Sequence, residues 1–414
     1  MSSKQCRSRS QCFADSHPEN AKARRAESAL DSAFRLLSAP FLAADGSPLT
    51  VHRPLNLYFH IPFCPRICPY CAFSVVRMDK TLAAAFEPRL LEEWARRRPD
   101  GRAVTLYFGG GTPTALSERT LERLLPPILP VAAEGAEVTM ECNPSTLSDS
   151  KAHLLRNLGV NRLSIGAQSF DPPVLRALGR THSPACIRAC VETARRAGIV
   201  RINLDLIFGV PGQSEESWRA TLRAALDLAP DHLSCYGLTY EEDTEFFRRL
   251  QRGEMRPAPD LERRQFEIAD EALGAAGFVH YEVSNYARPG AECRHNLDGW
   301  AGRDYVGIGP GAVSTVAAVR TRNGPILRDG SWEVAEREEL SPATLAAERI
   351  ALGLRTLRGV DEAVFLRDFG FPLRAHWRRE IARIVEEGLA APAPPLRLTR
   401  RGWLVADEIA QLFL

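Results

Sequence analysis

The sequence predicts an α/β protein whose core is an open, partial barrel of six strand–helix units, followed by a small winged-helix-like domain. Two observations predict this fold. Short β-rich runs alternate with longer helical runs from Leu55 onward, and residues 341–414 form a separate segment of helices with a small hairpin. Such alternation is typical of βαβ units and a parallel sheet. Six units are too few to close an eight-strand barrel, so we expect an open or partial one.

The repeating units follow one another in a regular order. Each expected strand is a short β-rich run, whereas each expected helix carries apolar residues at helical spacing. The expected strands are Leu55–His60, Val104–Phe108, Glu137–Cys142, Arg162–Gly166, Ile202–Phe208 and His232–Gly237. The expected helices are Thr81–Arg98, Ser117–Leu129, Ser148–Leu158, Ala185–Ala197, Glu215–Leu228 and Leu261–Ala276.

The chain is expected to divide into four parts. Residues 1–50 are predicted to be a partly disordered tail with a short helix at Ala26–Leu37, and residues 51–290 to be the core. Residues 291–340 are predicted to be a linker or lid region, and residues 341–414 a C-terminal domain. The elements expected in that domain are helices Leu345–Leu357 and Trp377–Glu387, a strand at Leu396–Thr399, a turn at Arg401-Gly402 and a last helix that reaches Leu414.

The composition argues against several classes of function. A formal net charge of +2 gives no basis for binding nucleic acid or an anionic membrane surface. No run approaches about 18 apolar residues, so no integral membrane span is expected, and the polar N-terminus lacks the apolar segment of a secretory signal. We therefore expect a cytoplasmic protein with reduced thiols. A close cluster among its ten cysteines then indicates metal binding.

Three cysteines follow the first expected strand in the spacing Cys64-x3-Cys68-x2-Cys71. Thiolates at this spacing can bind three irons of a [4Fe–4S] cluster and leave the fourth iron open, whereas purely electron-transferring clusters normally have four cysteines. S-adenosylmethionine (SAM) can chelate an open iron through its amino and carboxylate groups. An electron from the cluster then cleaves a carbon–sulfur bond and gives a 5′-deoxyadenosyl radical. A structural zinc site with His60 as fourth ligand is the alternative interpretation.

A glycine-rich turn, Gly109-Gly110-Gly111-Thr112-Pro113, follows the second expected strand. Glycines let the backbone approach a ligand closely and expose its N–H and C=O groups. Many such turns bind nothing. Because this turn comes one unit after the cysteine loop, it is a candidate for binding the methionine end of SAM.

These motifs together resemble the radical SAM group of oxygen-independent coproporphyrinogen III dehydrogenase and its heme-chaperone relatives. The resemblance runs from about Leu55 to the C-terminus. It is carried by Tyr58 with the cysteine triad, the Gly-Gly-Gly-Thr-Pro turn, Glu141-Cys142-Asn143-Pro144, Ser164–Phe170, Asp205–Gly212, Tyr281–Tyr286 and Tyr305–Gly309. It implies a partial six-unit radical SAM barrel, a [4Fe–4S] cluster, SAM and a HemN-like domain over residues 341–414.

The resemblance also implies roles for individual residues. Cys64, Cys68 and Cys71 would bind the cluster. The residues implied to contact SAM are Tyr58, Gly110, Gly111, Thr112 and Glu141, while Gln168, Arg180 and Asp205 match positions that touch SAM or a second ligand deeper in the barrel. Taken singly, each is equally well explained as a strand-end polar residue bonded to a loop. Because ligands bind at the carboxyl ends of parallel strands, the residues together predict a site.

Two features bear on which branch of the group the chain follows. The dehydrogenase typically carries a fourth cysteine two residues after the third, where this chain has Phe73, and an aromatic residue there is typical of the chaperones. The chaperones also carry a His-Asn-x-x-Tyr motif associated with heme binding. Here His295 and Asn296 match that motif, but Gly299 occupies the tyrosine position. Phe73 favours the chaperone branch, whereas Gly299 puts the heme site in question.

His295 is the best candidate for a heme ligand, because imidazole is a common axial ligand of heme iron. The alternative is a loop histidine satisfied by the backbone. Cys293 could be a thiolate ligand or a covalent attachment point for heme, although a buried inert thiol is the better interpretation. The 291–340 region is therefore expected to contribute to heme binding as well as to a lid.

Three hypotheses for the function follow. The first is a heme chaperone that binds heme and a SAM-ligated cluster and transfers heme to an acceptor protein. The second is a coproporphyrinogen III dehydrogenase that oxidatively decarboxylates two propionates to vinyl groups. The third is a non-catalytic iron–sulfur binding or regulatory protein. The expected partners are heme or a porphyrin, an unidentified acceptor and an electron donor, with no nucleic acid.

Overall fold

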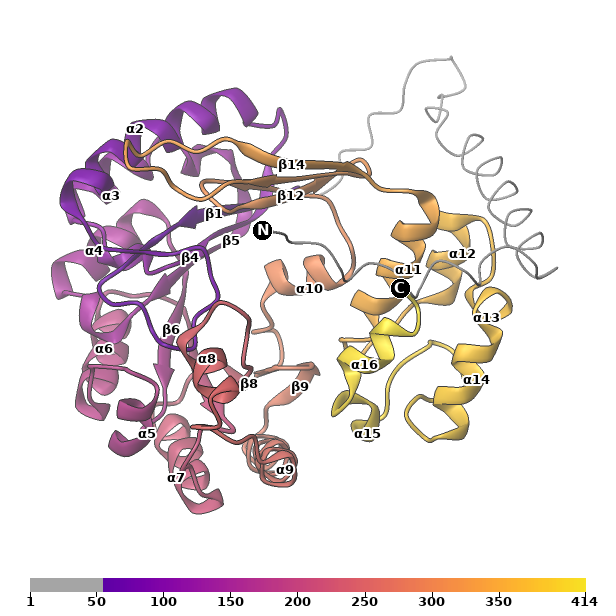
Figure 1. Ribbon diagram of the computed structural model, residues 1–414. Helices are drawn as coiled ribbons and strands as arrows, with labels where there is room; N and C mark the ends of the chain where they lie inside the picture. Colours follow the sequence, from indigo (N-terminus) through magenta and orange to yellow (C-terminus); the bar gives the residue numbers. More distant parts are fainter. Residues whose placement is uncertain (1–54) are drawn as a thin grey trace, which may run out of the picture.

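The computed structural model of the protein describes residues 55–414 (Figure 1). Six parallel strands form the centre of its main sheet in the order β1-β4-β5-β6-β7-β8. They are β1 (Leu55–Ile61), β4 (Ala103–Gly110), β5 (Ala132–Cys142), β6 (Arg162–Gln168), β7 (Arg201–Phe208) and β8 (His232–Gly237). In this order β1 and β8 do not pair, so the predicted open barrel of six units is confirmed. The helix predicted at Ala26–Leu37 and the 1–50 tail lie outside the described residues.

Helices cover the outer face of this sheet (Figure 1). They are α2 (Lys80–Arg97), α3 (Glu118–Leu124), α4 (Asp149–Leu158), α5 (Pro172–Ala177), α6 (Pro184–Arg196), α7 (Glu215–Leu226) and α9 (Pro259–Ala275). Helix α8 (Glu245–Gln251) packs instead against the cysteine loop, where the Phe246 N–H donates to the Pro69 carbonyl at 3.0 Å. Short 3-10 helices are η1 (Pro113–Ala115), η2 (Leu129–Val131) and η3 (Pro144–Thr146). Ser148 and Ser214 start α4 and α7 by accepting backbone N–H groups three residues later. The helix predicted over Ser117–Leu129 ends at Leu124, because Pro126 and Pro127 cannot continue it.

Alternation along the strands separates the core from the barrel interior. In β1, Leu57, Phe59 and Ile61 are fully buried on the face that packs against the helices. Tyr58 lies between them and projects from the opposite face, because successive side chains of a strand alternate. The Phe59 ring stacks on Phe108 of β4 at 4.9 Å between centroids, which joins the first two strands of the barrel.

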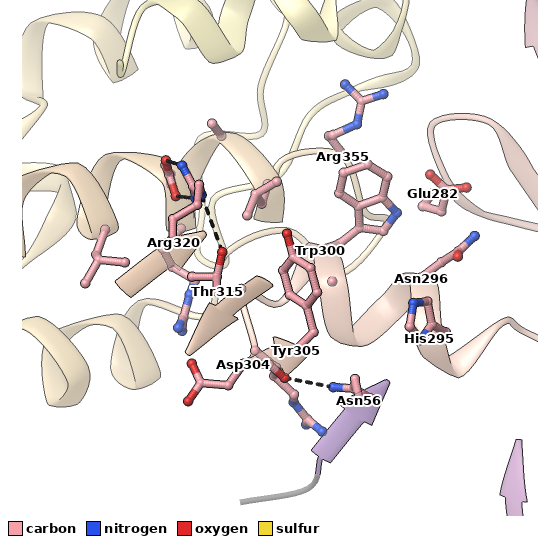
Figure 2. A pocket seen from close by; sticks show the side chains of 18 of the residues that line it. Asn56, Glu282, His295, Asn296, Trp300, Asp304, Tyr305, Thr315, Arg320 and Arg355 are labelled. Atoms are coloured by element: carbon pink, nitrogen blue, oxygen red, sulfur yellow. Dashed lines mark hydrogen bonds and ion pairs between the residues drawn. The ribbon is translucent and has the colours of Figure 1, made fainter. Parts of the chain in front are cut away.

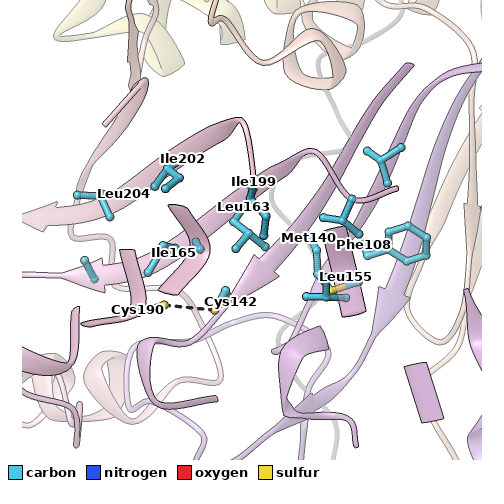
Figure 3. Packing of buried hydrophobic residues seen from close by; sticks show 14 of the residues in the cluster. Phe108, Met140, Cys142, Leu155, Leu163, Ile165, Cys190, Ile199, Ile202 and Leu204 are labelled. Carbon is cyan, nitrogen blue, oxygen red and sulfur yellow. Dashed lines mark hydrogen bonds between the residues drawn. The ribbon is translucent and has the colours of Figure 1, made fainter. Parts of the chain in front are cut away.

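The core continues between β6, β7 and α6, as Figure 3 shows for Leu163, Ile165 and Ile202. Cys142 at the end of β5 and Cys190 of α6 belong to this cluster, and their sulfur atoms lie 3.8 Å apart. Cys190 is therefore a core residue. No helix within residues 55–414 has the length and apolar character needed to cross a membrane.

The main sheet extends beyond the six parallel strands at both ends. Strands β10 (Asn285–Ala287) and β9 (Val279–Glu282) follow β8, and β11 (Tyr305–Ile308) lies parallel to β1, followed by β12 (Val313–Val316), β13 (Val319–Asn323) and β14 (Val334–Glu339). The region 291–340, predicted as a linker, thus supplies four strands and helix α10 (Arg294–Trp300). These strands were not predicted, because they are short and β14 is exposed along its whole length, which leaves no apolar alternation.

The C-terminal domain is a small helical unit with its own hydrophobic core. Its helices are α11 (Pro342–Gly353), α12 (Glu362–Phe369), α13 (Leu373–His376), α14 (Arg378–Glu386), α15 (Arg400–Trp403) and α16 (Ala406–Gln411). The strand predicted at Leu396–Thr399 is reduced to two isolated bridges, Val360 with Leu396 and Ala390 with Leu398. The turn predicted at Arg401-Gly402 was wrong, because the Thr399 side chain accepts the Gly402 N–H and starts α15 there.

Candidate functional site

The three cysteines of the predicted cluster site lie on one loop at the carboxyl end of β1. Cys64 ends the short strand β2 (Phe63–Cys64), which pairs with β3 (Val76–Arg77), and the Cys71 N–H donates to the Cys68 carbonyl at 3.1 Å. All three thiols are half-buried and free of disulfides. The Thr112 hydroxyl donates to Cys64 Sγ at 3.7 Å and the Arg180 guanidinium to Cys68 Sγ at 3.5 Å. The loop therefore offers three sulfur ligands and two donors that stabilise thiolates, a set that fits a [4Fe–4S] cluster.

His60 does not supply a fourth ligand to this loop. Its Nε2 donates to the Ser74 carbonyl at 2.8 Å, and its Nδ1 accepts from the Tyr58 hydroxyl at 3.1 Å, so both ring nitrogens are occupied. Within residues 55–414 no three His, Cys, Asp or Glu side chains converge closely enough to hold one metal ion. The zinc alternative thus has no supporting geometry. Cluster thiolates each bind a different iron and do not need to converge on a single ion.

The glycine turn packs directly against the cysteine loop. The Gly111 and Thr112 N–H groups donate to the Ile61 and Phe63 carbonyls at 2.9 and 2.8 Å. Gly110 has φ +102°, and a Cβ there would lie 2.4 Å from the His60 ring. Only glycine therefore fits at position 110, and the turn and the cysteine loop form one rigid unit.

Glu141, at the carboxyl end of β5, is held next to this turn. The Tyr107 hydroxyl donates to Glu141 Oε1 at 2.9 Å, and the Gly110 N–H donates to Oε2 at 3.0 Å. Burial, and then repulsion from Asp205, raises the pKa of Glu141 to about 7. The two hydrogen bonds fix the position of this buried carboxylate. A cationic ligand bound next to it would therefore be stabilised by charge attraction.

The deeper predicted residues lie on the neighbouring strands. Asp205 of β7 accepts from Asn203 Nδ2 at 2.7 Å and from the Ser164 hydroxyl at 3.1 Å, and burial raises its pKa. Gln168, at the end of β6, has φ +65°, a strained conformation for a residue other than glycine. Gln168 and Arg180 both lie against Gly166, where an added Cβ would meet their side chains at 3.0 and 3.3 Å. The structure therefore gathers the predicted residues at the interior and carboxyl end of the barrel.

His295 lies on α10 beside the aromatic side chains of β1 and β4. Its ring centroid is 5.0 Å from that of Tyr107 and 6.4 Å from that of Tyr58. The Thr105 hydroxyl donates to Asn56 Oδ1 at 2.8 Å, so the same hydroxyl accepts from His295 Nδ1 at 2.8 Å. Burial lowers the pKa of His295 to about 4. The imidazole is therefore neutral near pH 7, with its proton on Nδ1 and a lone pair on Nε2.

A cavity of about 1380 Å³ opens next to His295, between the barrel, α10 and the C-terminal domain (Figure 2). Its volume exceeds the roughly 300–1,000 Å³ of ordinary small-molecule pockets. Gly299 and Tyr305 line it, and the Arg355 guanidinium lies 4.8 Å above the Trp300 ring in its wall. The cavity is thus lined by an imidazole, aromatic rings and paired charges, and it has room for a flat macrocycle.

Helix α10 is positioned by Glu137 of β5. One oxygen of its carboxylate accepts the His295 N–H at 3.2 Å and the other accepts the Arg294 N–H at 3.2 Å, while Cys293 Sγ donates to Oε1 at 3.4 Å. Cys293 is buried, and burial raises the pKa of its thiol to about 12, in keeping with the predicted inert thiol. The sequence reasoning missed Glu137, Thr105 and Tyr107. The available signal was the polar alternation of β4, where Thr105 and Tyr107 alternate with buried Leu106 and Phe108.

Two family models match the chain. The model of the Radical SAM superfamily matches residues 58–225, and the model of the HemN C-terminal domain matches residues 340–405. The first covers the cysteine loop, the glycine turn, Glu141 and Asp205.

Several curated proteins match nearly the whole chain. The heme chaperone HemW of Lactococcus lactis is 35% identical over 376 residues, which cover 88% of this chain and 98% of that protein. The heme chaperone HemW of Escherichia coli is 41% identical over 377 residues, covering 87% and 98%. The solved structure of coproporphyrinogen III oxidase HemN from Escherichia coli superimposes with a TM-score of 0.75 at 23% identity, covering 87% of this chain and 90% of that one. That last likeness shows a shared fold.

Proposed function

The chain belongs to the HemW family of radical SAM proteins, and from this premise we propose that it binds heme beside His295 and transfers it to an acceptor protein. The observation that carries the proposal is the state of the His295 ring. Its Nδ1 is bound to Thr105, its pKa is about 4, and it lines a cavity of about 1380 Å³. A neutral imidazole with an oriented Nδ1–H is the form that binds heme iron.

The radical SAM core works with a [4Fe–4S] cluster and SAM, and we assign their binding to the barrel mouth. Cys64, Cys68 and Cys71 would hold the cluster, and Thr112 and Arg180 would stabilise its thiolates. When bound, cluster and SAM supply one-electron reductive chemistry. The residues proposed to orient SAM are Tyr58, Gly110, Gly111, Thr112, Glu141, Gln168, Arg180 and Asp205. Among them, Glu141 offers a carboxylate to the cationic end of SAM, and the glycine turn leaves its backbone open to it.

The first experiment is a heme titration of the full chain, followed by its Soret absorbance. His295→Ala is expected to weaken binding about tenfold or more and to change the Soret band, because the axial ligand is lost. His153→Ala is the matched control, since His153 is an exposed residue of α4 on the outer face of the barrel. Equal affinity and an unchanged Soret band in His295→Ala would remove His295 from this role.

A second experiment separates the chaperone from the dehydrogenase. The chain is reconstituted anaerobically and incubated with coproporphyrinogen III, SAM and a reductant. The proposal predicts no conversion of propionates to vinyl groups. Phe73 supports this outcome, because it stands where the dehydrogenase typically has a fourth cysteine, and its side chain is 71% exposed beside the cluster loop. Formation of protoporphyrinogen would establish the dehydrogenase function instead.

A further inference from the structure

Tyr107 contacts both proposed sites at once. Its hydroxyl donates to Glu141 Oε1 at 2.9 Å, and its ring centroid lies 5.0 Å from that of His295, with 31° between the ring planes. Tyr107 also stacks on Tyr58 at 6.0 Å, and the two residues are register partners on β4 and β1. One side chain therefore spans the distance between the carboxylate of the SAM site and the imidazole of the cavity.

The hydrogen bonds around Glu141 make this contact responsive to a ligand. Both carboxylate oxygens are occupied, Oε1 by Tyr107 and Oε2 by the Gly110 N–H. SAM carries a positive sulfonium, which favours the ionised carboxylate. A hydroxyl donating to an ionised carboxylate makes a shorter and stronger hydrogen bond than one donating to a neutral acid. A cation at Glu141 therefore fixes the Tyr107 hydroxyl more firmly.

The His295 ring depends on Tyr107 for part of its position. Its Nδ1 is held by Thr105, but that hydrogen bond leaves the ring free to tilt about the N–H direction. The ring of Tyr107 packs against it and limits this tilt, and Tyr58 lies farther away at 6.4 Å. Restricting Tyr107 thus restricts the direction in which His295 Nε2 points.

We propose that Tyr107 is a positioning residue that couples occupancy of the SAM site at Glu141 to occupancy of the heme cavity at His295. The inference rests on the proposed function and describes how its two sites communicate. SAM at Glu141 restricts the orientation of Tyr107, and Tyr107 in turn restricts the tilt of the His295 ring. Heme then binds to an imidazole whose orientation is already fixed, so binding costs less conformational entropy. Coupling of this kind is positive and reciprocal, so heme strengthens SAM binding by the same factor.

The test uses the full chain with its cluster reconstituted anaerobically. Heme affinity is measured with and without SAM for the wild type, Tyr107→Phe and a control, Tyr286→Phe. Tyr286 is buried on β10 and stacks on His280, and its hydroxyl makes no hydrogen bond within residues 55–414. SAM is expected to tighten heme binding by about fivefold or more in the wild type and in Tyr286→Phe. In Tyr107→Phe both ligands still bind, and the ratio falls to about one.

A second readout does not require heme. Diethyl pyrocarbonate acylates the unprotonated nitrogen of a neutral imidazole, and peptide mass spectrometry reports the rate at His295. The rate is expected to change on adding SAM in the wild type and in Tyr286→Phe, and to be insensitive to SAM in Tyr107→Phe. A SAM-independent rate in the wild type, or a wild-type response in Tyr107→Phe, overturns the coupling. If the wild type fails to bind heme, yet its His295 rate responds to SAM and the response is lost in Tyr107→Phe, the heme function is contradicted and the coupling of Glu141 to His295 is supported.

Discussion

The hydrogen bond between Thr105 and His295 allows a direct test of how the imidazole is prepared. Thr105 is fully buried on β4, and its hydroxyl accepts from His295 Nδ1 while donating to Asn56 Oδ1, both at 2.8 Å. Thr105→Val has nearly the same shape but no hydroxyl. The variant keeps the packing of β4 and leaves the His295 Nδ1–H and the Asn56 oxygen without their partner.

The size of the effect follows from these two losses. Removing the partner that orients a metal-binding histidine typically costs 10–100-fold in metal affinity, which is about 1.4–2.8 kcal/mol. The stranded polar groups also cost stability, about 1–3 kcal/mol for a buried donor or acceptor left unpaired. We therefore expect Thr105→Val to weaken heme binding 10–100-fold and to lower the free energy of unfolding by roughly 1–3 kcal/mol.

The assay is a heme titration at pH 7.5 together with urea unfolding of the heme-free protein. Thr105→Ser is the control, since it keeps the hydroxyl and removes only a methyl group. It should retain heme affinity within a few-fold of wild type. A Thr105→Val protein that is folded and binds heme with wild-type affinity would refute the assignment of the Nδ1 proton and the role of the His295 ring.

Three further predictions concern the rest of the site. Gly110→Ala introduces a Cβ at φ +102° against the His60 ring, so we expect a loss of at least about 1–3 kcal/mol of stability and poor iron incorporation, measured by urea unfolding and iron analysis. The control is Gly101→Ala, because a Cβ added at half-buried Gly101 meets nothing within 4 Å. Burial raises the pKa of Glu141 to about 7 in the folded protein, above its unfolded value near 4.5. Folding therefore takes up a proton between these pH values, and the stability of the wild type falls as the pH rises. The free energy of unfolding of Glu141→Gln should thus increase by roughly 1–3 kcal/mol relative to that of the wild type between pH 4.5 and 7, measured by urea titration of the ligand-free protein. A pH-independent difference would contradict the raised pKa. Glu137→Ala removes the acceptor for the start of α10 and is expected to cost about 1–3 kcal/mol and to weaken heme binding, whereas exposed Glu134→Ala on the same strand should match the wild type.

Local patterns in the sequence were sufficient to predict the barrel and the cluster site. Alternating short and long runs report backbone periodicity, which is a local property, and all six parallel strands formed where the pattern placed them within a few residues. The cysteine loop and the glycine turn lie next to one another because they follow β1 and β4, which are neighbours in the sheet. Phe59 of β1 and Phe108 of β4 are register partners. A metal site on one short loop can be predicted from the sequence, because the chain itself keeps its ligands close together.

The heme side of the site was decided by the tertiary structure. The acceptor for His295 lies 190 residues earlier in the chain, and Glu137, which holds α10, lies about as far from it in sequence. Strand β11 pairs with β1 across an even larger separation, from Asn56 to Tyr305, and brings Tyr305 to the cavity wall. No local periodicity encodes such pairs, because they form only when distant segments pack. The sequence alone predicted the cluster and SAM chemistry, and the packing of distant segments placed Tyr107 between Glu141 and His295.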